Sequence, residues 1–140
     1  MQNIVELAKS VEVDIPVAAL LAKDGEIIAV ATNQKEQKNN ATYHAEMLVI
    51  DEASKKLGRW RLNDCDLYVT LEPCPMCAWA ILQARIKNVY FGSFDNLYGA
   101  LGSKIDLREI ANSKTNVKGG IMEEECNKIL EKYFEKIRNE

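Results

Sequence analysis

The sequence predicts an α/β fold in which a mixed sheet of about five strands is covered by helices on both faces. Two observations carry this expectation. Two apolar runs joined by Asp24-Gly25 indicate a β-hairpin, because glycine accepts the positive φ that a tight turn needs. After the hairpin, apolar stretches of strand length alternate with stretches of helical periodicity, which is typical of a sheet packed between helices.

The first half of the chain is expected to hold two helices and the hairpin. Apolar residues recur at near-helical spacing in residues 2–10, which predicts a short opening helix. A polar stretch at 33–40 is expected to be a loop. The hairpin strands are expected at 16–22 and 26–32, and a helix at 44–57, with Met47, Leu48, Ile50 and Ala53 facing inward and Gly58 ending it.

The second half alternates strands and helices and closes with an amphipathic helix. A helix is predicted to start at Pro75, because proline suits the first helical position. The closing helix at 123–138 carries Ile129, Leu130, Phe134 and Ile137 on one side. The other elements are expected as strands at 67–71, 88–91 and around Val117, helices at 75–84 and 105–110, and a loop at 92–103.

Bulk properties indicate one domain spanning residues 1–140 in a reducing cytoplasm. No apolar run approaches the roughly 20 residues that cross a bilayer, so no membrane association is expected. Four cysteines without a secretory signal argue against disulfides, and Cys65 and Cys126 are interpreted as small core residues. The net charge of -3 is unusual for a nucleic-acid binder, although it does not exclude a local basic patch.

Two short motifs carry the chemistry. His44 and Glu46 stand two residues apart, and Cys74 and Cys77 form a Cys-x-x-Cys pair further along. One imidazole and two thiolates give a zinc ion three protein ligands and leave its fourth position open, which is typical of a catalytic site. Glu46 is not needed as a ligand, so it is interpreted as the residue that moves protons.

Each motif taken alone has a simpler explanation. A Cys-x-x-Cys pair is more often a redox pair or half of a structural zinc site. A redox role does not explain His44 or Glu46, and a four-cysteine site needs a second close pair, which Cys65 and Cys126 do not make. Together the two motifs form the signature of zinc-dependent base deaminases, which predicts one Zn²⁺ per chain and no organic cofactor.

Over nearly its whole length the chain resembles bacterial tRNA adenosine deaminases, of the cytidine and deoxycytidylate deaminase superfamily. These enzymes convert the wobble adenosine of a tRNA anticodon to inosine and release ammonia. Besides the two motifs, the resemblance rests on Ile15-Pro16-Val17, Asn33, Thr42, Trp60-Arg61-Leu62, Leu67 to Pro73, Met76, Ala78, Arg85-Ile86, Phe91-Gly92, Asp95 and Gly102-Ser103.

The resemblance implies a cytidine-deaminase-like three-layer α/β/α sandwich that forms a homodimer and acts on the anticodon loop. It also implies three substrate contacts. Asn33 would hydrogen-bond the flipped base, the backbone carbonyl of Glu72 would complete the pocket, and Asp95 would contact the ribose. From the residues alone, Asn33 and Asp95 also suit turns.

Two other functions stay open at this stage. A deaminase of a free base or nucleoside (guanine, cytosine or an adenine derivative) would explain the acidic charge without an RNA groove. A silent zinc-bearing partner subunit is the other possibility, and the presence of Glu46 argues against it. Ala18, Tyr43 and Trp79 are bulkier than the residues usual in the family, so they either reshape the pocket or pack in the core.

Overall fold

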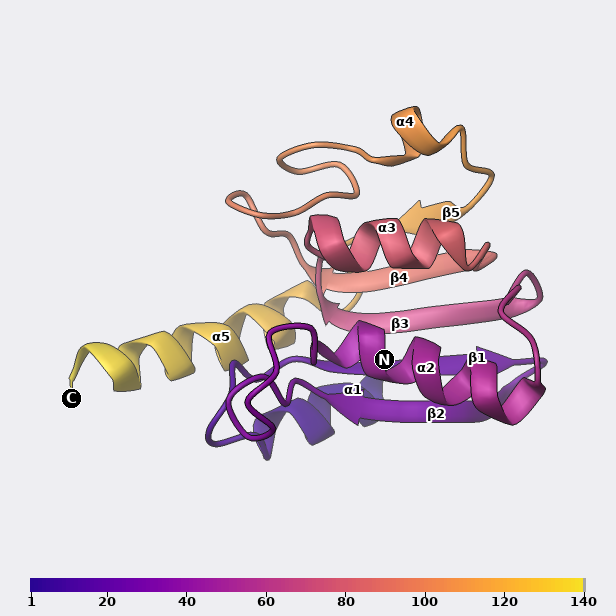
Figure 1. Cartoon of the computed structure of the whole chain (residues 1–140). Helices are drawn as coiled ribbons and strands as arrows, with labels where there is room; N and C mark the ends of the chain where they lie inside the picture. The colour runs from indigo at the N-terminus through magenta and orange to yellow at the C-terminus, as the bar shows by residue number, and fades with distance from the viewer. Residues whose placement is uncertain (140) are drawn as a thin grey trace.

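Five strands form one mixed sheet in the order β2-β1-β3-β4-β5. The computed structural model describes residues 1–139. The central strand β3 pairs antiparallel with β1 and parallel with β4, so the sheet changes from antiparallel to parallel pairing at its middle. The strands are β1 (Ala18–Lys23), β2 (Glu26–Thr32), β3 (Cys65–Leu71), β4 (Asn88–Ser93) and β5 (Asn116–Lys118), as Figure 1 shows.

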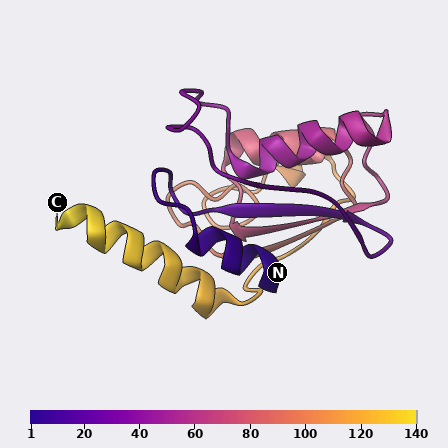
Figure 2. The same ribbon diagram turned by 90° about the horizontal axis from the view of Figure 1, so that it is seen from below.

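Helices cover both faces of this sheet, so the expected three-layer α/β/α architecture is confirmed. Figure 2 shows α2 (Ala45–Leu57) and α3 (Pro75–Gln83) together on one face. On the other face lie α1 (Gln2–Lys9) and α5 (Glu123–Arg138). The short helix α4 (Arg108–Ala111) belongs to the long connection between β4 and β5. No helix within residues 1–139 combines the length and the apolarity that a bilayer crossing requires.

The turn chemistry of the sequence sets the boundaries around the site. Asp24 and Gly25 adopt φ of 51° and 77°, which is the backbone that a tight hairpin between β1 and β2 needs. Gly58 ends α2 in the left-handed conformation, as predicted. Pro75 begins α3 directly after Cys74, which fixes where that helix starts relative to β3.

The core is largest between the sheet and the α2/α3 layer. Apolar side chains of β1, β3 and β4 pack there against the two helices, and a smaller cluster around Ile4 and Leu20 lies under α1. The free thiols of Cys65 and Cys126 are buried, in agreement with their interpretation as core residues. The short helix was predicted at 105–110, and the structure begins it three residues later.

The inward face of α2 agrees with the prediction only in part. Ala53 is buried and Ile50 packs against the core, as predicted. Met47 and Leu48 are only half-buried, whereas Glu46 and Val49 are buried. The expectation took the most apolar residues as the inner stripe. Residues three or four positions apart lie on the same face of a helix. Val49 is three residues after Glu46 and Ala53 is four residues after Val49, so both share the inward face with Glu46.

The closing helix also packs less than its pattern predicts. Its bounds agree with the expected 123–138, but Cys126 is the only residue of α5 that the structure buries. Ile129 packs against the cluster under α1, while Phe134 and Ile137 remain exposed. The second half of α5, which carries Phe134 and Ile137, extends past the ends of the strands, as Figure 2 shows.

We expect Leu67→Ala to destabilise the fold by about 2–5 kcal/mol, because it opens a cavity in the central strand under α2 and α3. The free energy of unfolding from denaturant titration measures this loss. Ile110→Ala is the control, since Ile110 is 75% exposed and its truncation removes no core contact. Equal effects of the two substitutions would contradict this assignment of the core.

Candidate metal centre and active site

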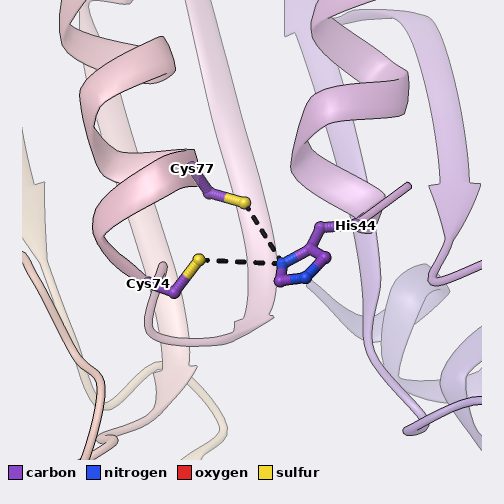
Figure 3. A group of neighbouring side chains, drawn as sticks. All are labelled: His44, Cys74 and Cys77. Atoms are coloured by element: carbon purple, nitrogen blue, oxygen red, sulfur yellow. Dashed lines mark hydrogen bonds between the residues drawn. The ribbon is translucent and has the colours of Figure 1, made fainter. Parts of the chain in front are cut away.

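Two helix starts bring the predicted metal ligands together. His44 immediately precedes α2, and Cys74 immediately precedes α3, each in an extended backbone conformation. Cys77 lies in the first turn of α3, on the same side as Cys74 (Figure 3). Because α2 and α3 lie side by side on one face of the sheet, the three side chains point toward one another.

The geometry of these three residues fits a tetrahedral zinc ion. His44 Nδ1 lies 3.7 Å from the sulfur of Cys74 and 3.4 Å from that of Cys77. With ordinary Zn–S and Zn–N bond lengths, a tetrahedral site separates sulfur from nitrogen by about 3.5 Å. All three ligand atoms lie within 4.8 Å of one another. The donor set and its spacing therefore suit a zinc site with one open position.

The Cys74 thiol ionises more readily than an ordinary cysteine. The Cys77 thiol donates a hydrogen bond to Cys74, which lowers the pKa of Cys74 to about 4 and raises that of Cys77. The contact with Cys74 also raises the pKa of His44. A divalent cation placed between the sulfurs would favour the thiolate form of both, because each proton competes with the metal for the same lone pair.

Glu46 lies beside the three ligands and is almost fully buried, with 4% of its surface exposed. Burial raises the pKa of its carboxyl to about 7. A carboxyl with this pKa both takes up and releases a proton near neutral pH, which is what a proton shuttle needs. Glu46 is the second residue of α2 and His44 immediately precedes this helix, so the positions of the two residues are linked by the helix backbone.

A cleft of about 460 Å³ opens onto this centre. His44, Glu46 and Cys74 line it, and so do all three predicted substrate residues, Asn33, Glu72 and Asp95. The fold therefore brings the predicted residues to one place, although they come from four separate segments of the chain. Tyr98, Tyr133, Asp14, Ile15 and Lys35 also line the cleft and were not predicted, since no spacing in the sequence connects them to the motifs.

The side chains of Asn33 and Asp95 both take part in backbone hydrogen bonds. Asn33 Oδ1 accepts a hydrogen bond of 2.8 Å from the amide of Ala45, the first residue of α2. Its amide nitrogen remains as a donor. Asp95 Oδ1 accepts from the amides of Leu97 and Tyr98, each at 3.0 Å, so the residue does form the turn that the sequence also suggested.

The carboxylate of Glu72 is held by the protein itself. It is buried, and it accepts hydrogen bonds from the amides of Asp95, Leu101 and Ser103 at 3.1–3.2 Å. It also accepts one from the Ser103 hydroxyl. These bonds fix the connection after β4 against the end of β3. The substrate contact predicted for Glu72 concerns its backbone carbonyl, which these bonds do not involve.

Comparison with known proteins places this site in a family. A family model described as the cytidine and deoxycytidylate deaminase zinc-binding region matches residues 1–93, which include all three ligands and Glu46. The chain belongs to this deaminase family. The family's name states the metal, so zinc is the cofactor that His44, Cys74 and Cys77 are positioned to bind.

Individual deaminases of this family resemble the chain over most of its length. The tRNA-specific adenosine deaminase of Bacillus subtilis is 45% identical across 99% of this chain and 88% of its own length. That of Aquifex aeolicus is 39% identical across 90% of this chain and 84% of its own.

Solved structures show the same likeness. One from a study of A-to-I editing by tRNA:A34 deaminases superposes with a TM-score of 0.77 at 40% identity, covering 84% and 86% of the two chains. Guanine deaminase from Nitrosomonas europaea superposes with a TM-score of 0.79 at 20% identity, over 94% of this chain and 81% of the other. At that identity the second comparison shows a shared fold and no more.

Ala18, Tyr43 and Trp79, which were expected either to reshape the pocket or to pack in the core, do not line the cleft. Ala18 is buried in β1, where its amide donates to the hydroxyl of Thr70. Tyr43 is half-buried, and its carbonyl accepts from the amide of Gln34. Trp79 lies on α3 and is 40% exposed. The possibility that these side chains reshape the substrate pocket is therefore not supported by their positions.

We expect the protein, purified under reducing conditions, to contain about one zinc ion per chain, and Cys77→Ser to lose most of it. Metal content by mass spectrometry of the acidified protein measures both. Cys126→Ser is the control, because that thiol is buried away from the centre. A full complement of zinc in the Cys77→Ser variant would contradict the ligand assignment.

We also expect zinc affinity to fall on acidification. The pKa of His44 is raised, so the imidazole keeps its proton to a higher pH than usual, and zinc must displace that proton. Affinity should therefore drop by about ten-fold per pH unit for each displaced proton once the pH is below this pKa. Competition with a chelator at mildly acidic and mildly alkaline pH measures the change. The Cys77 thiol also loses its proton on zinc binding, so an affinity that does not depend on pH would contradict the assignment of both His44 and Cys77 as ligands.

Proposed function

We propose that this chain is a zinc-dependent hydrolase that converts adenosine to inosine at the wobble position of a tRNA anticodon and releases ammonia. The arrangement of a buried Glu46, whose pKa is about 7, beside a zinc-binding His44-Cys74-Cys77 set supports the reaction. The near full-length similarity to tRNA-specific adenosine deaminases supports the substrate.

We assign the chemical steps to Glu46. Zinc held by His44, Cys74 and Cys77 would act as a Lewis acid and lower the pKa of water to about 7. Glu46 takes a proton from the attacking water and passes it to the adenine ring nitrogen as the new C–O bond forms. Glu46 then takes the proton of the newly added hydroxyl and gives it to the departing amine as the C–N bond breaks. Both protons of the water are thereby used, and water and adenosine become inosine and ammonia.

Three residues are proposed to hold the substrate. Asn33 donates from its amide nitrogen to the flipped base, since its oxygen is already engaged by Ala45. The backbone carbonyl of Glu72 accepts from the base, and the free carboxylate oxygen of Asp95 is available to the ribose 2′-hydroxyl. We further propose that residues 1–140 form a single domain, that the protein is a cytoplasmic homodimer, and that no organic cofactor takes part.

A substrate panel tests the activity. We expect the protein to release inosine from an anticodon stem-loop, with little or no turnover of single-stranded DNA, free adenine, guanine, cytosine or nucleosides. Binding of the stem-loop should weaken as salt is added, because phosphate contacts release counterions. Turnover of a free base without turnover of the stem-loop would identify a nucleobase deaminase instead, and no turnover of any substrate would indicate a silent zinc protein.

Glu46→Gln tests the proton shuttle. The amide has nearly the shape of the carboxyl but cannot exchange a proton, so we expect turnover to fall by about 10²–10⁴-fold or more. Zinc content and the unfolding midpoint should stay close to those of the unmodified protein. Glu52→Gln on the same helix is the control, because its carboxylate is at the surface and pairs with Lys56. Substantial residual activity in Glu46→Gln would remove this residue from the mechanism.

A further inference from the structure

The connection after β4 forms one wall of the cleft and is built to hold its shape. We define it as the 94–103 loop, and it contributes Asp95 and Tyr98 to the cleft. The buried carboxylate of Glu72 accepts hydrogen bonds from three backbone amides of this loop. A buried carboxylate with several charge-assisted hydrogen bonds is a strong local restraint. The loop is therefore positioned before any substrate arrives.

The same loop is also tied to the residue that precedes a metal ligand. The amide of Ala100 donates a 2.9 Å hydrogen bond to the carbonyl of Pro73, the residue before Cys74. At Gly99 there is no room for a side chain, because a Cβ atom would collide with the Glu72 carboxylate and with the carbonyl of Asp95. Tyr98 precedes these two anchored residues, so its distance from the metal centre is set by the backbone.

Tyr98 itself presents an exposed aromatic ring from this rigid backbone. Its amide is bound to Asp95, yet 66% of the residue is exposed and it lines the cleft. Within residues 1–139 its ring forms none of the aromatic pairs, whereas the neighbouring Phe94 packs edge-on against Phe91. The contact with Phe91 therefore accounts for an aromatic residue at position 94, whereas no such contact accounts for the aromatic ring of Tyr98.

The residues that line the cleft differ in exposure. Glu46 is buried, whereas Tyr98 is open to solvent. A base that reaches Glu46 leaves the solvent, so an exposed ring in the lining of the same cleft is available to a neighbour of that base. Unpaired bases of an RNA loop commonly stack on such aromatic side chains.

We propose that Tyr98 forms a stacking subsite for the unpaired nucleobase next to the target adenosine. The subsite rests on the proposed function and specifies it further, because a free base has no neighbour to place there. Rigidity of the 94–103 loop matters to this role, since a ring that is already in position loses little conformational entropy when a base stacks on it.

A double-mutant cycle between the protein and the RNA tests the subsite. kcat/KM is measured for the unmodified protein, Tyr98→Leu and Tyr98→Phe on an anticodon stem-loop. The same measurements are made on stem-loops in which the nucleotide on either side of the target is abasic. Leu97→Ala is the control, because Leu97 is 74% exposed on the same loop and does not line the cleft.

We expect Tyr98→Leu to lower kcat/KM about ten-fold on the intact stem-loop. On one of the two abasic stem-loops, Tyr98→Leu should change kcat/KM little, because the base that would stack on the ring is already missing. Tyr98→Phe and Leu97→Ala should behave like the unmodified protein. Zinc content should be the same in all variants.

Equal losses for Tyr98→Leu on the intact and both abasic stem-loops would overturn the subsite and leave the proposed function intact. So would a change in the oligomeric state of Tyr98→Leu, which would show that the ring contacts a second copy of the chain. If the unmodified protein deaminates no stem-loop at all, the proposed function fails, and the subsite fails with it.

Discussion

The site depends on one constraint, which is that α2 and α3 begin at the same edge of the sheet. Each helix supplies its ligands from its first residues, so a shift of either start by one residue would turn a ligand away from the other two. Pro75 limits such a shift in α3, because proline at the first helical position fixes where that helix starts. The apolar core under the two helices then keeps them side by side.

Local chemistry explains why so much of this could be predicted. Several signals affect only the few residues next to them, so their effects can be predicted from the sequence. They are the Asp24-Gly25 turn, Gly58, Pro75 and the spacing of the apolar residues. The metal ligands were predictable because His44-x-Glu46 and the Cys74-x-x-Cys77 pair have a spacing that only a few kinds of site share. In these places the prediction and the structure agree.

The remaining residues of the site could not be found in this way. Tyr98 and Tyr133 reach the cleft through the tertiary arrangement of a loop and the last helix, and nothing near them in the sequence indicates it. The inner stripe of α2 was predicted only in part. Hydrophobicity alone favours Met47 and Leu48, but α2 buries the smaller apolar residues Ala45, Val49 and Ala53 together with Glu46.

The hydrogen bond from Ala45 to Asn33 has a further consequence. A helix start is usually stabilised by a Ser, Asp or Asn immediately before it, but here that position holds His44, whose side chain makes no capping bond. Asn33 supplies the acceptor from the end of β2 instead. It therefore serves helix stability and the orientation of a metal ligand at once. A loss of activity on changing Asn33 thus cannot by itself be attributed to weaker recognition of the base.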